Sequence, residues 1–389
     1  MQIRLLIFFI WSLCITSTQA QTTWAEKSGI PVSRCIACGF SIGNYGYVGT
    51  GIVNGRLGND FWKYDPLTDT WTEIDSMPTL GRRGAFSFSI GNKGYVGGGV
   101  NSHSLTDDEF WEYDADRSAW TRKANMPSGL VYSSETLVGF SIGANGYLLA
   151  AINRSNFYMY NPSSDTWSKM ENFPGPKALD QMGFSIGGKG YIGSGFGNNT
   201  YYAEFWEYDP ANNQWSRKAD VPGQPRTDAV GFSVGNYGYF GLGTYRTDLL
   251  FDFWEYHPLT DTWIQIDSCG YAAWYALGIG IGSKGYMGTG VRFSDDSGWW
   301  EYTPNVSSTN NIGESCLVNI YPNPVRDNIH IDTREPGPIT VSVYSIMGRL
   351  VKSALITDRI VPASELPVGV YTLKIRLADQ VVSKKFVKE

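Results

Sequence analysis

Short runs of alternating apolar and polar residues recur along the chain, and each is followed by a glycine-containing turn. In one copy, Gly-Phe-Ser-Ile-Gly at 183–187 leads into a second run that ends at Gly193. A variable insert follows, then an aromatic run at 205–209 and a last run that opens on Trp215. Alternation with a period of two predicts strands, and no segment has a helical period. The pattern predicts an all-β chain with four strands per copy.

The copies repeat at a nearly constant interval. The apolar anchor of the first strand occurs six times, with steps of 48, 52, 44, 48 and 47 residues, at Phe40, Phe88, Phe140, Phe184, Phe232 and Ile279. Units of this length bury their apolar faces only against copies of themselves. Four strands in nearly fifty residues are typical of one blade of a β-propeller. We therefore expect a six-bladed propeller.

The sixth copy lacks a fourth strand, and the N-terminal end of the chain supplies a candidate. Trp24 stands seven residues before Pro31, the same interval that separates Trp71 from Pro78. The run around Trp24 is therefore expected to form the outer strand beside residues 299–302, which closes the ring and covers its open edges.

The glycines after the second strand, the Tyr-Asp pair and the following Trp resemble the kelch repeat. In the second copy these residues are Gly97-Gly98-Gly99, Tyr113-Asp114 and Trp120. The resemblance covers roughly residues 24–304, and only the third copy departs from it at the glycines, where Leu148–Ala151 stand. It implies a propeller of the galactose oxidase and kelch type.

The two ends of the chain have a different character. Residues 1–20 combine Arg4, an apolar core and a polar end, the pattern of a secretory signal peptide cleaved near Ala20. No other run is long enough to span a membrane. Residues 21–304 are assigned to the propeller, the small polar residues 305–316 to a linker, and 317–389 to a small C-terminal β-sandwich.

The motifs of that C-terminal sandwich resemble the sorting domain of type IX secretion (Por) substrates. They are Tyr-Pro-Asn-Pro at 321–324, Leu-Pro-Val-Gly-Val-Tyr at 366–371 and the lysine-rich end. The resemblance implies export through the type IX machinery, with the mature protein secreted or attached to the outer cell surface. An ordinary adhesive sandwich is the alternative.

Four cysteines remain after removal of the signal peptide, an even number in an exported chain. They are Cys35, Cys38, Cys269 and Cys316, and all four are predicted to form disulfides. Three pairings are open; a bond between Cys35 and Cys269, which lie before the first strands of blades one and six, is favoured.

Binding residues are expected on the face that carries the variable connectors. Side chains six, five and four residues before each anchor should ring the mouth, the end of the central channel where the first strands begin. The candidate ligand-binding residues there are Arg34, Arg82, Arg226, Asp180, Asp228, Trp274 and Tyr275. Guanidinium groups and aromatic rings suit an anionic sugar. The alternative is that the arginines pair with neighbouring acids and tie blades together.

Other chemistry finds less support. The formal net charge of −6, without a Lys/Arg stripe, argues against nucleic acid as a partner. No metal or other cofactor is expected: the chain has three histidines, and the acidic groups near 107–109 and 295–296 lack EF-hand spacing. We therefore expect a non-catalytic kelch-repeat protein that binds a glycan or an extracellular protein. The alternative is a sugar epimerase or mutarotase that uses Asp180, Asp228 or Glu135, together with an arginine, at the channel mouth.

Overall fold

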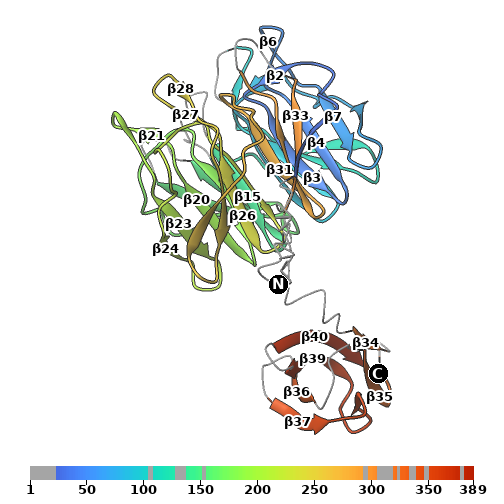
Figure 1. Ribbon diagram of the computed structural model, residues 1–389. Helices are drawn as coiled ribbons and strands as arrows, with labels where there is room; N and C mark the ends of the chain where they lie inside the picture. Colours follow the sequence, from blue (N-terminus) through green and yellow to red (C-terminus); the bar gives the residue numbers. More distant parts are fainter. Residues whose placement is uncertain are drawn as a thin grey trace, which may run out of the picture. The chain divides into compact units, whose positions relative to one another are not determined.

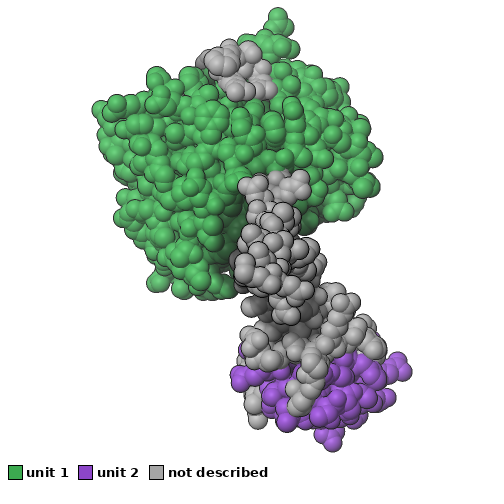
Figure 2. All heavy atoms as spheres, viewed as in Figure 1, with its two compact units in different colours: residues 1–305 green, residues 306–389 purple. Residues whose placement is uncertain are grey.

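The computed structural model describes residues 23–103, 108–127, 137–150, 155–291, 297–304, 319–321, 325–332, 339–345, 350–376 and 381–389. The predicted signal peptide (1–20) and the whole predicted linker (305–316) lie outside these residues, as do Glu135 and Cys316. The chain divides into two compact units, Met1–Asn305 and Val306–Glu389 (Figure 2). The described residues are all-β, and among them no helix is long and apolar enough to cross a membrane.

The first unit contains six four-stranded antiparallel sheets (Figure 1), numbered one to six here in chain order. Their first strands are β3 (Cys38–Ile42), β10 (Phe86–Ile90), β15 (Leu137–Ile142), β19 (Met182–Ile186), β25 (Val230–Val234) and β31 (Leu277–Ile281). The second strands are β4 (Tyr45–Gly49), β11 (Lys93–Gly97), β16 (Asn145–Ala150), β20 (Lys189–Gly193), β26 (Tyr237–Gly241) and β32 (Lys284–Gly288). The third strands are β7 (Phe61–Asp65), β13 (Phe110–Asp114), β17 (Asn156–Asn161), β23 (Phe205–Asp209), β29 (Phe253–His257) and β33 (Trp299–Thr303). The outer strands are β8 (Thr70–Ile74), β14 (Ala119–Arg122), β18 (Thr166–Lys169), β24 (Gln214–Lys218), β30 (Thr262–Ile266) and, in sheet six, β1 (Thr23–Lys27).

Short strands lie in the connectors on one side of these sheets, both within a sheet and between neighbouring sheets (Figure 1). They are β2 (Arg34–Cys35), β5 (Ile52–Val53), β6 (Arg56–Leu57), β9 (Arg82–Arg83), β12 (Val100–Asn101), β21 (Phe196–Gly197), β22 (Thr200–Tyr201), β27 (Thr244–Tyr245) and β28 (Asp248–Leu249). They form hairpins and pairs such as β21–β22 and β27–β28. This is the set of variable connectors on which the sequence placed the binding residues.

Neighbouring sheets interlock where an aromatic ring meets a glycine. A Cβ on Gly94 of β11 would lie 2.0 Å from the ring of Phe40 on β3, in the preceding sheet. A Cβ on Gly285 of β32 would lie 2.1 Å from the ring of Phe232 on β25. Only glycine permits this close approach, which is why the second strand of each copy carries one. Each first strand contacts the next in chain order, and β31 contacts β3.

The outer strands are joined by a tryptophan that repeats in every sheet. Its indole N–H donates to a backbone carbonyl of the preceding sheet, as from Trp120 to Asp75 at 2.8 Å. Strand β1 takes part on both sides. Trp24 donates to the Asp267 carbonyl at 2.7 Å, and Trp71 donates to the Ser28 carbonyl at 2.7 Å. Trp24 is paired with Tyr302 of β33, at the place that its spacing from Pro31 predicted.

The second unit contains two antiparallel sheets. The first, in the order β34-β35-β38, consists of β34 (Asn319–Tyr321), β35 (Asn328–Asp332) and β38 (Ile360–Pro362). The second, in the order β37-β36-β39-β40, consists of β37 (Leu350–Ile356), β36 (Ile339–Ser345), β39 (Gly369–Arg376) and β40 (Val381–Lys388). Side chains from both sheets form one core, in which Ile329, Val341, Leu373 and Phe386 are buried. The unit therefore has its own hydrophobic core.

Candidate binding site at the channel mouth

The three candidate arginines are buried instead of facing the channel mouth. Arg34 and Arg82 are 0% exposed and Arg226 is 1% exposed. Each lies on or beside a short connector strand, in the register that the sequence predicted. The long side chain runs inward, between the end of the second strand and the start of the third.

Each buried guanidinium binds a carboxylate and a backbone carbonyl of its own sheet. Arg226 contacts both carboxylate oxygens of Asp252, at 2.6 and 2.7 Å, and donates to the Leu242 carbonyl at 3.0 Å. Arg34 binds Asp60 in the same manner, with a shortest distance of 2.6 Å. Arg82 lies 3.0 Å from Glu109. Such bidentate or buried pairs fix strand ends in place.

The carboxyl groups of these pairs have lowered pKa values. Burial raises the pKa of the Asp252 carboxyl, but the hydrogen bonds from Arg226 and the Trp254 indole outweigh burial and hold the pKa below its usual value. The same balance, with Arg34 and Trp62, lowers the pKa of Asp60. The arginine charges are thus neutralised inside the protein. The arginines pair with acids, as the alternative expected, although each pair lies within one sheet and does not tie two sheets together. Binding of an anionic sugar by these arginines stays a prediction.

The sequence contains a signal for these pairs that the register of arginines alone does not reveal. An acid stands two residues before the third-strand tryptophan in each copy that has an arginine, 26 or 27 residues after it. Copy six has neither: Ala273 stands in the arginine register and Gly298 in the acid register. Copy four keeps the acid, Glu204, with Ala178 in place of the arginine.

The predicted acids Asp180 and Asp228 each accept a hydrogen bond from a threonine hydroxyl. Both residues have positive φ, 52° and 58°. The Thr227 hydroxyl donates to Asp180 at 3.3 Å, and the Thr244 hydroxyl donates to Asp228 at 3.2 Å. The first of these bonds links the connector of sheet four to that of sheet five. Two carboxylates and two hydroxyls therefore lie together beside the starts of β19 and β25.

The predicted aromatic residues lie at the start of sheet six. Trp274 is 38% exposed, and its backbone forms a bridge with Val291. Tyr275 has a φ of 56°, in the register where Asp180 and Asp228 also have positive φ. Non-glycine residues in this conformation are uncommon, and their repetition marks a fixed backbone shape around the mouth.

A cavity of about 180 Å³ occupies the channel mouth. The first strands of all six sheets contribute to it, and the residues three positions before the anchors are Ala37, Ala85, Leu137, Gln181, Ala229 and Ala276. Deeper in the channel, a second cavity of about 140 Å³ is lined by glycines and by hydroxyls such as those of Ser41, Ser89 and Ser185. The channel is therefore narrow, and its polar groups are uncharged.

Gln181 is the one polar residue in its register, and it was not among the predicted site residues. Its side chain is 8% exposed, and neither amide atom has a hydrogen-bond partner among the described residues. A buried polar group without a partner costs about 1–3 kcal/mol of folding free energy. The contrast with alanine or leucine in the other five copies is the signal that would have identified it.

The described cysteines do not form the favoured bond. Cys269 is a thiol, and its sulfur accepts the Tyr271 N–H at 3.4 Å, so no Cys35–Cys269 disulfide is present between these described residues. Cys38 is also a thiol; burial raises its pKa to about 11 in spite of a hydrogen bond from Thr50. Cys316 lies outside the described residues.

The described residues contain no group of three or more His, Cys, Asp or Glu that could hold a metal ion. Glu109, from the acidic group near 107–109, is bound to Arg82. Residues 295 and 296 lie outside the description.

Two family models match parts of the chain. Residues 319–389 match the secretion system C-terminal sorting domain, and residues 46–78 match the kelch motif. The resemblance of the chain to kelch repeats and to a sorting domain is therefore confirmed. The sorting domain indicates export through type IX secretion to the cell surface or beyond.

A curated relative and a solved structure extend the comparison. N-acetylneuraminate epimerase of Yersinia enterocolitica serotype O:8 / biotype 1B is 26% identical over 166 residues, which are 40% of this chain. The match covers 41% of that relative, so the chain spans less than half its length. The solved structure titled "Structure of YjhT" has a TM-score of 0.61 at 15% identity and covers 72% of this chain and 98% of its own. That likeness shows a kelch-type propeller fold.

Proposed function

We propose that the mature protein is an exported, six-bladed kelch propeller, closed by β1, that binds a small uncharged sugar at the channel mouth without catalysing a reaction. In this proposal, residues 1–20 are a signal peptide, 21–304 the propeller, 305–316 a linker and 317–389 the sorting domain. The cyclic contacts of the first strands and the two-sided bonding of β1 support the closed ring.

The observation that carries the binding proposal is the unpartnered amide of Gln181 in the mouth. A carboxamide offers a donor and an acceptor, the combination that pairs with a sugar hydroxyl. The desolvation cost of this group is offset when a ligand supplies the missing hydrogen bonds. Asp180, Asp228 and their threonine partners flank the position and provide further acceptors.

The charge of the site favours an uncharged ligand over an acidic one. The arginines that would attract a carboxylate are held by Asp60, Glu109 and Asp252. No charged side chain lines the cavity at Gln181, and the carboxylates of Asp180 and Asp228 just outside this lining would repel an anionic sugar. Pockets for drug-sized ligands measure about 300–1,000 Å³. A cavity of about 180 Å³ therefore suits a ligand no larger than a single sugar unit.

A sugar epimerase is the second candidate, because part of the chain matches N-acetylneuraminate epimerase. Such an activity needs an acid and a base on either side of the reacting carbon or ring oxygen. Asp180 and Asp228 are the carboxylates positioned to serve. Both already accept threonine hydroxyls, and the acidic surroundings disfavour a carboxylated substrate.

The test uses the chain's own repeat as a guide to substitution. Gln181→Ala gives blade four the residue that copies one, two, five and six carry, and Gln181→Leu gives it the residue of copy three. Both variants should fold normally and lose binding of neutral sugars, measured by saturation-transfer NMR on the mature chain. Unchanged binding would exclude the Gln181 site. NMR of anomer exchange and of epimer formation, with neutral sugars and N-acetylneuraminate, separates the two candidates.

A further inference from the structure

The connectors of sheets four and five form two aromatic hairpins beside the mouth. In β21–β22, the rings of Phe196 and Tyr201 lie 4.6 Å apart, centroid to centroid. Tyr201 continues the row into the next hairpin, with its ring 4.9 Å from that of Tyr245 on β27. Each of these three residues is partly exposed. The three rings therefore form one row across two blades.

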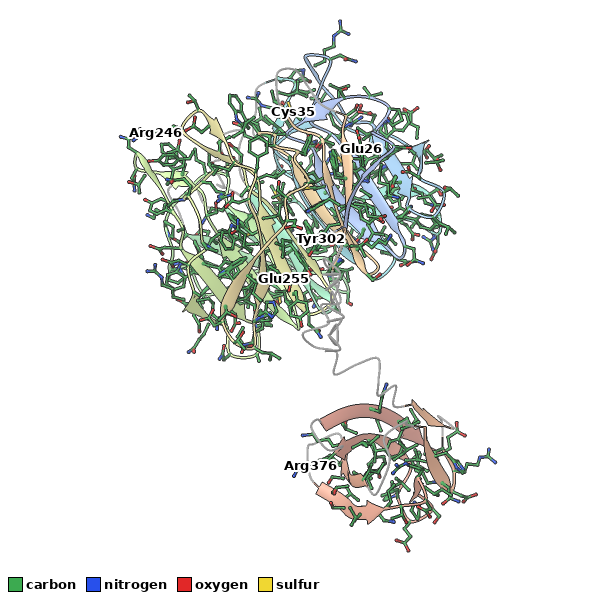
Figure 3. The ribbon with its side chains drawn as sticks, in the orientation of Figure 1. Glu26, Cys35, Arg246, Glu255, Tyr302 and Arg376 are labelled. Carbon is green, nitrogen blue, oxygen red and sulfur yellow. The ribbon has the colours of Figure 1, made fainter. Side chains whose placement is uncertain are left out.

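The row is fixed by backbone bonds. The Tyr201 hydroxyl accepts the backbone N–H of Arg246 at 2.9 Å, which ties the two hairpins together. Arg246 has a φ of 58°, and its guanidinium lies 5.2 Å from the centre of the Tyr245 ring. Figure 3 shows Arg246 at the tip of the β27–β28 hairpin. Rings held in this way lose little conformational freedom on binding a ligand, which is why tyrosine and arginine are frequent in binding surfaces.

The row continues directly from the polar groups of the mouth. Thr244, whose buried hydroxyl donates to Asp228, is the residue before Tyr245. Leu179, the residue before Asp180, is bridged through its backbone to Phe196. The same two blades thus carry both the mouth's polar groups and the rings. The corresponding hairpin of sheet one, β5–β6, has Ile52, Val53, Arg56 and Leu57 and no ring.

We propose that the ligand is a neutral oligosaccharide, with its terminal unit in the mouth and its next units stacked on the row of Phe196, Tyr201 and Tyr245. The inference rests on the proposed function and extends it from one sugar to a chain. The C–H face of a pyranose is apolar and packs on an aromatic ring, while Arg246 lies within reach of the hydroxyls at its edge. A mouth too small for more than one unit requires any further units to leave along a surface.

The experiment compares chain lengths on the full mature protein. Probes are glucose and N-acetylglucosamine against the tetrasaccharides of the malto-, cello- and chito- series, with affinities from calorimetry. Wild type should bind one tetrasaccharide at least about 10-fold more tightly than its monosaccharide, because ring stacking adds favourable contacts. Tyr201→Ala should remove that gain and leave the monosaccharide affinity unchanged. Tyr201→Phe, which keeps the ring, and Arg56→Ala, on the hairpin of sheet one, should retain the gain.

Each outcome assigns the failure to one proposal. Gln181→Ala should weaken monosaccharide and tetrasaccharide alike. A wild type that binds monosaccharides without any gain from chain length would overturn the aromatic row and leave the mouth site standing. The aromatic row would also be overturned if Tyr201→Ala kept the gain in tetrasaccharide affinity. It would be overturned as well if Tyr201→Ala lost binding to a protein partner while its sugar binding was unchanged. Failure of all probes to bind wild type would overturn both proposals.

Discussion

Replacing Arg226 with alanine should destabilise the propeller strongly, because the substitution leaves charged and polar groups without their partner. The Asp252 carboxylate loses two hydrogen bonds to the guanidinium, and the Leu242 carbonyl loses one. Removing one partner of a buried ion pair costs about 3–5 kcal/mol. The Asp252 side chain is 23% exposed, so water can reach part of it, and we expect the free energy of unfolding to fall by about 3 kcal/mol.

A double-mutant cycle separates this pairing from loss of side-chain packing. In Arg226→Ala/Asp252→Ala both charges are removed together, as copy six does with Ala273 and Gly298. The double variant should be more stable than Arg226→Ala by at least about 1 kcal/mol, because no carboxylate is left uncompensated. The control is Arg217→Ala, which breaks an ion pair with Asp220 in which both side chains are 50% exposed. That surface pair should contribute less than about 1 kcal/mol.

The assay is urea unfolding of the mature chain, followed by tryptophan fluorescence. All tryptophans of the mature chain lie before residue 305, so the signal reports on the first unit alone. If Arg226→Ala proves as stable as Arg217→Ala, or if the double variant is less stable than Arg226→Ala, the buried pair does not stabilise the blade as argued.

Three further predictions concern acid stability, ring closure and export. Hydrogen bonds and positive charges outweigh burial and lower the pKa values of four carboxyl groups, those of Asp60, Glu109, Asp252 and Glu301. These groups stabilise the folded state fully above their unfolded pKa values of about 4, and this stabilisation is lost as the pH falls through the lower folded pKa values. Urea midpoints should therefore fall steeply below about pH 4 and less steeply in Arg226→Ala/Asp252→Ala, and equal slopes would argue against the pairs as the cause. Deleting residues 21–31 should lower the thermal unfolding midpoint markedly, because β33 then has an open edge and the Trp71 indole loses its acceptor, the Ser28 carbonyl. An unchanged midpoint would refute closure by β1. Removing 317–389 should leave a folded propeller in the periplasm on cell fractionation, and its normal arrival outside the cell would show that the tail does not direct export.

Strand positions could be predicted from the sequence because their causes are local. The alternation in each copy and the tight turns after the first strands depend on residues a few positions apart. The interval between Trp24 and Pro31 predicted an outer strand near the N-terminus, and the structure pairs Trp24 with Tyr302 there. Because the unit repeats, each of these local patterns could be compared across six copies.

The site was harder to predict because its chemistry depends on partners from other segments. Whether Arg226 faces solvent or a carboxylate is decided by Asp252, 26 residues later. Comparing the acid register with the arginine register across copies would have revealed the pairing. Gln181 was readable in the same way, as a polar residue among alanines and leucine, but its lack of partners is visible only in three dimensions.

The most direct test of the mouth site observes the Gln181 side chain itself. Selective ¹⁵N labelling of glutamine side chains gives one amide pair per residue, and loss of a pair in Gln181→Leu assigns it. During titration of the mature chain with the neutral sugar that binds most tightly, the Gln181 amide protons should shift downfield as they gain an acceptor, and saturate with the binding isotherm. A Gln181 signal that stays in place while the sugar saturates the protein would contradict binding at the channel mouth.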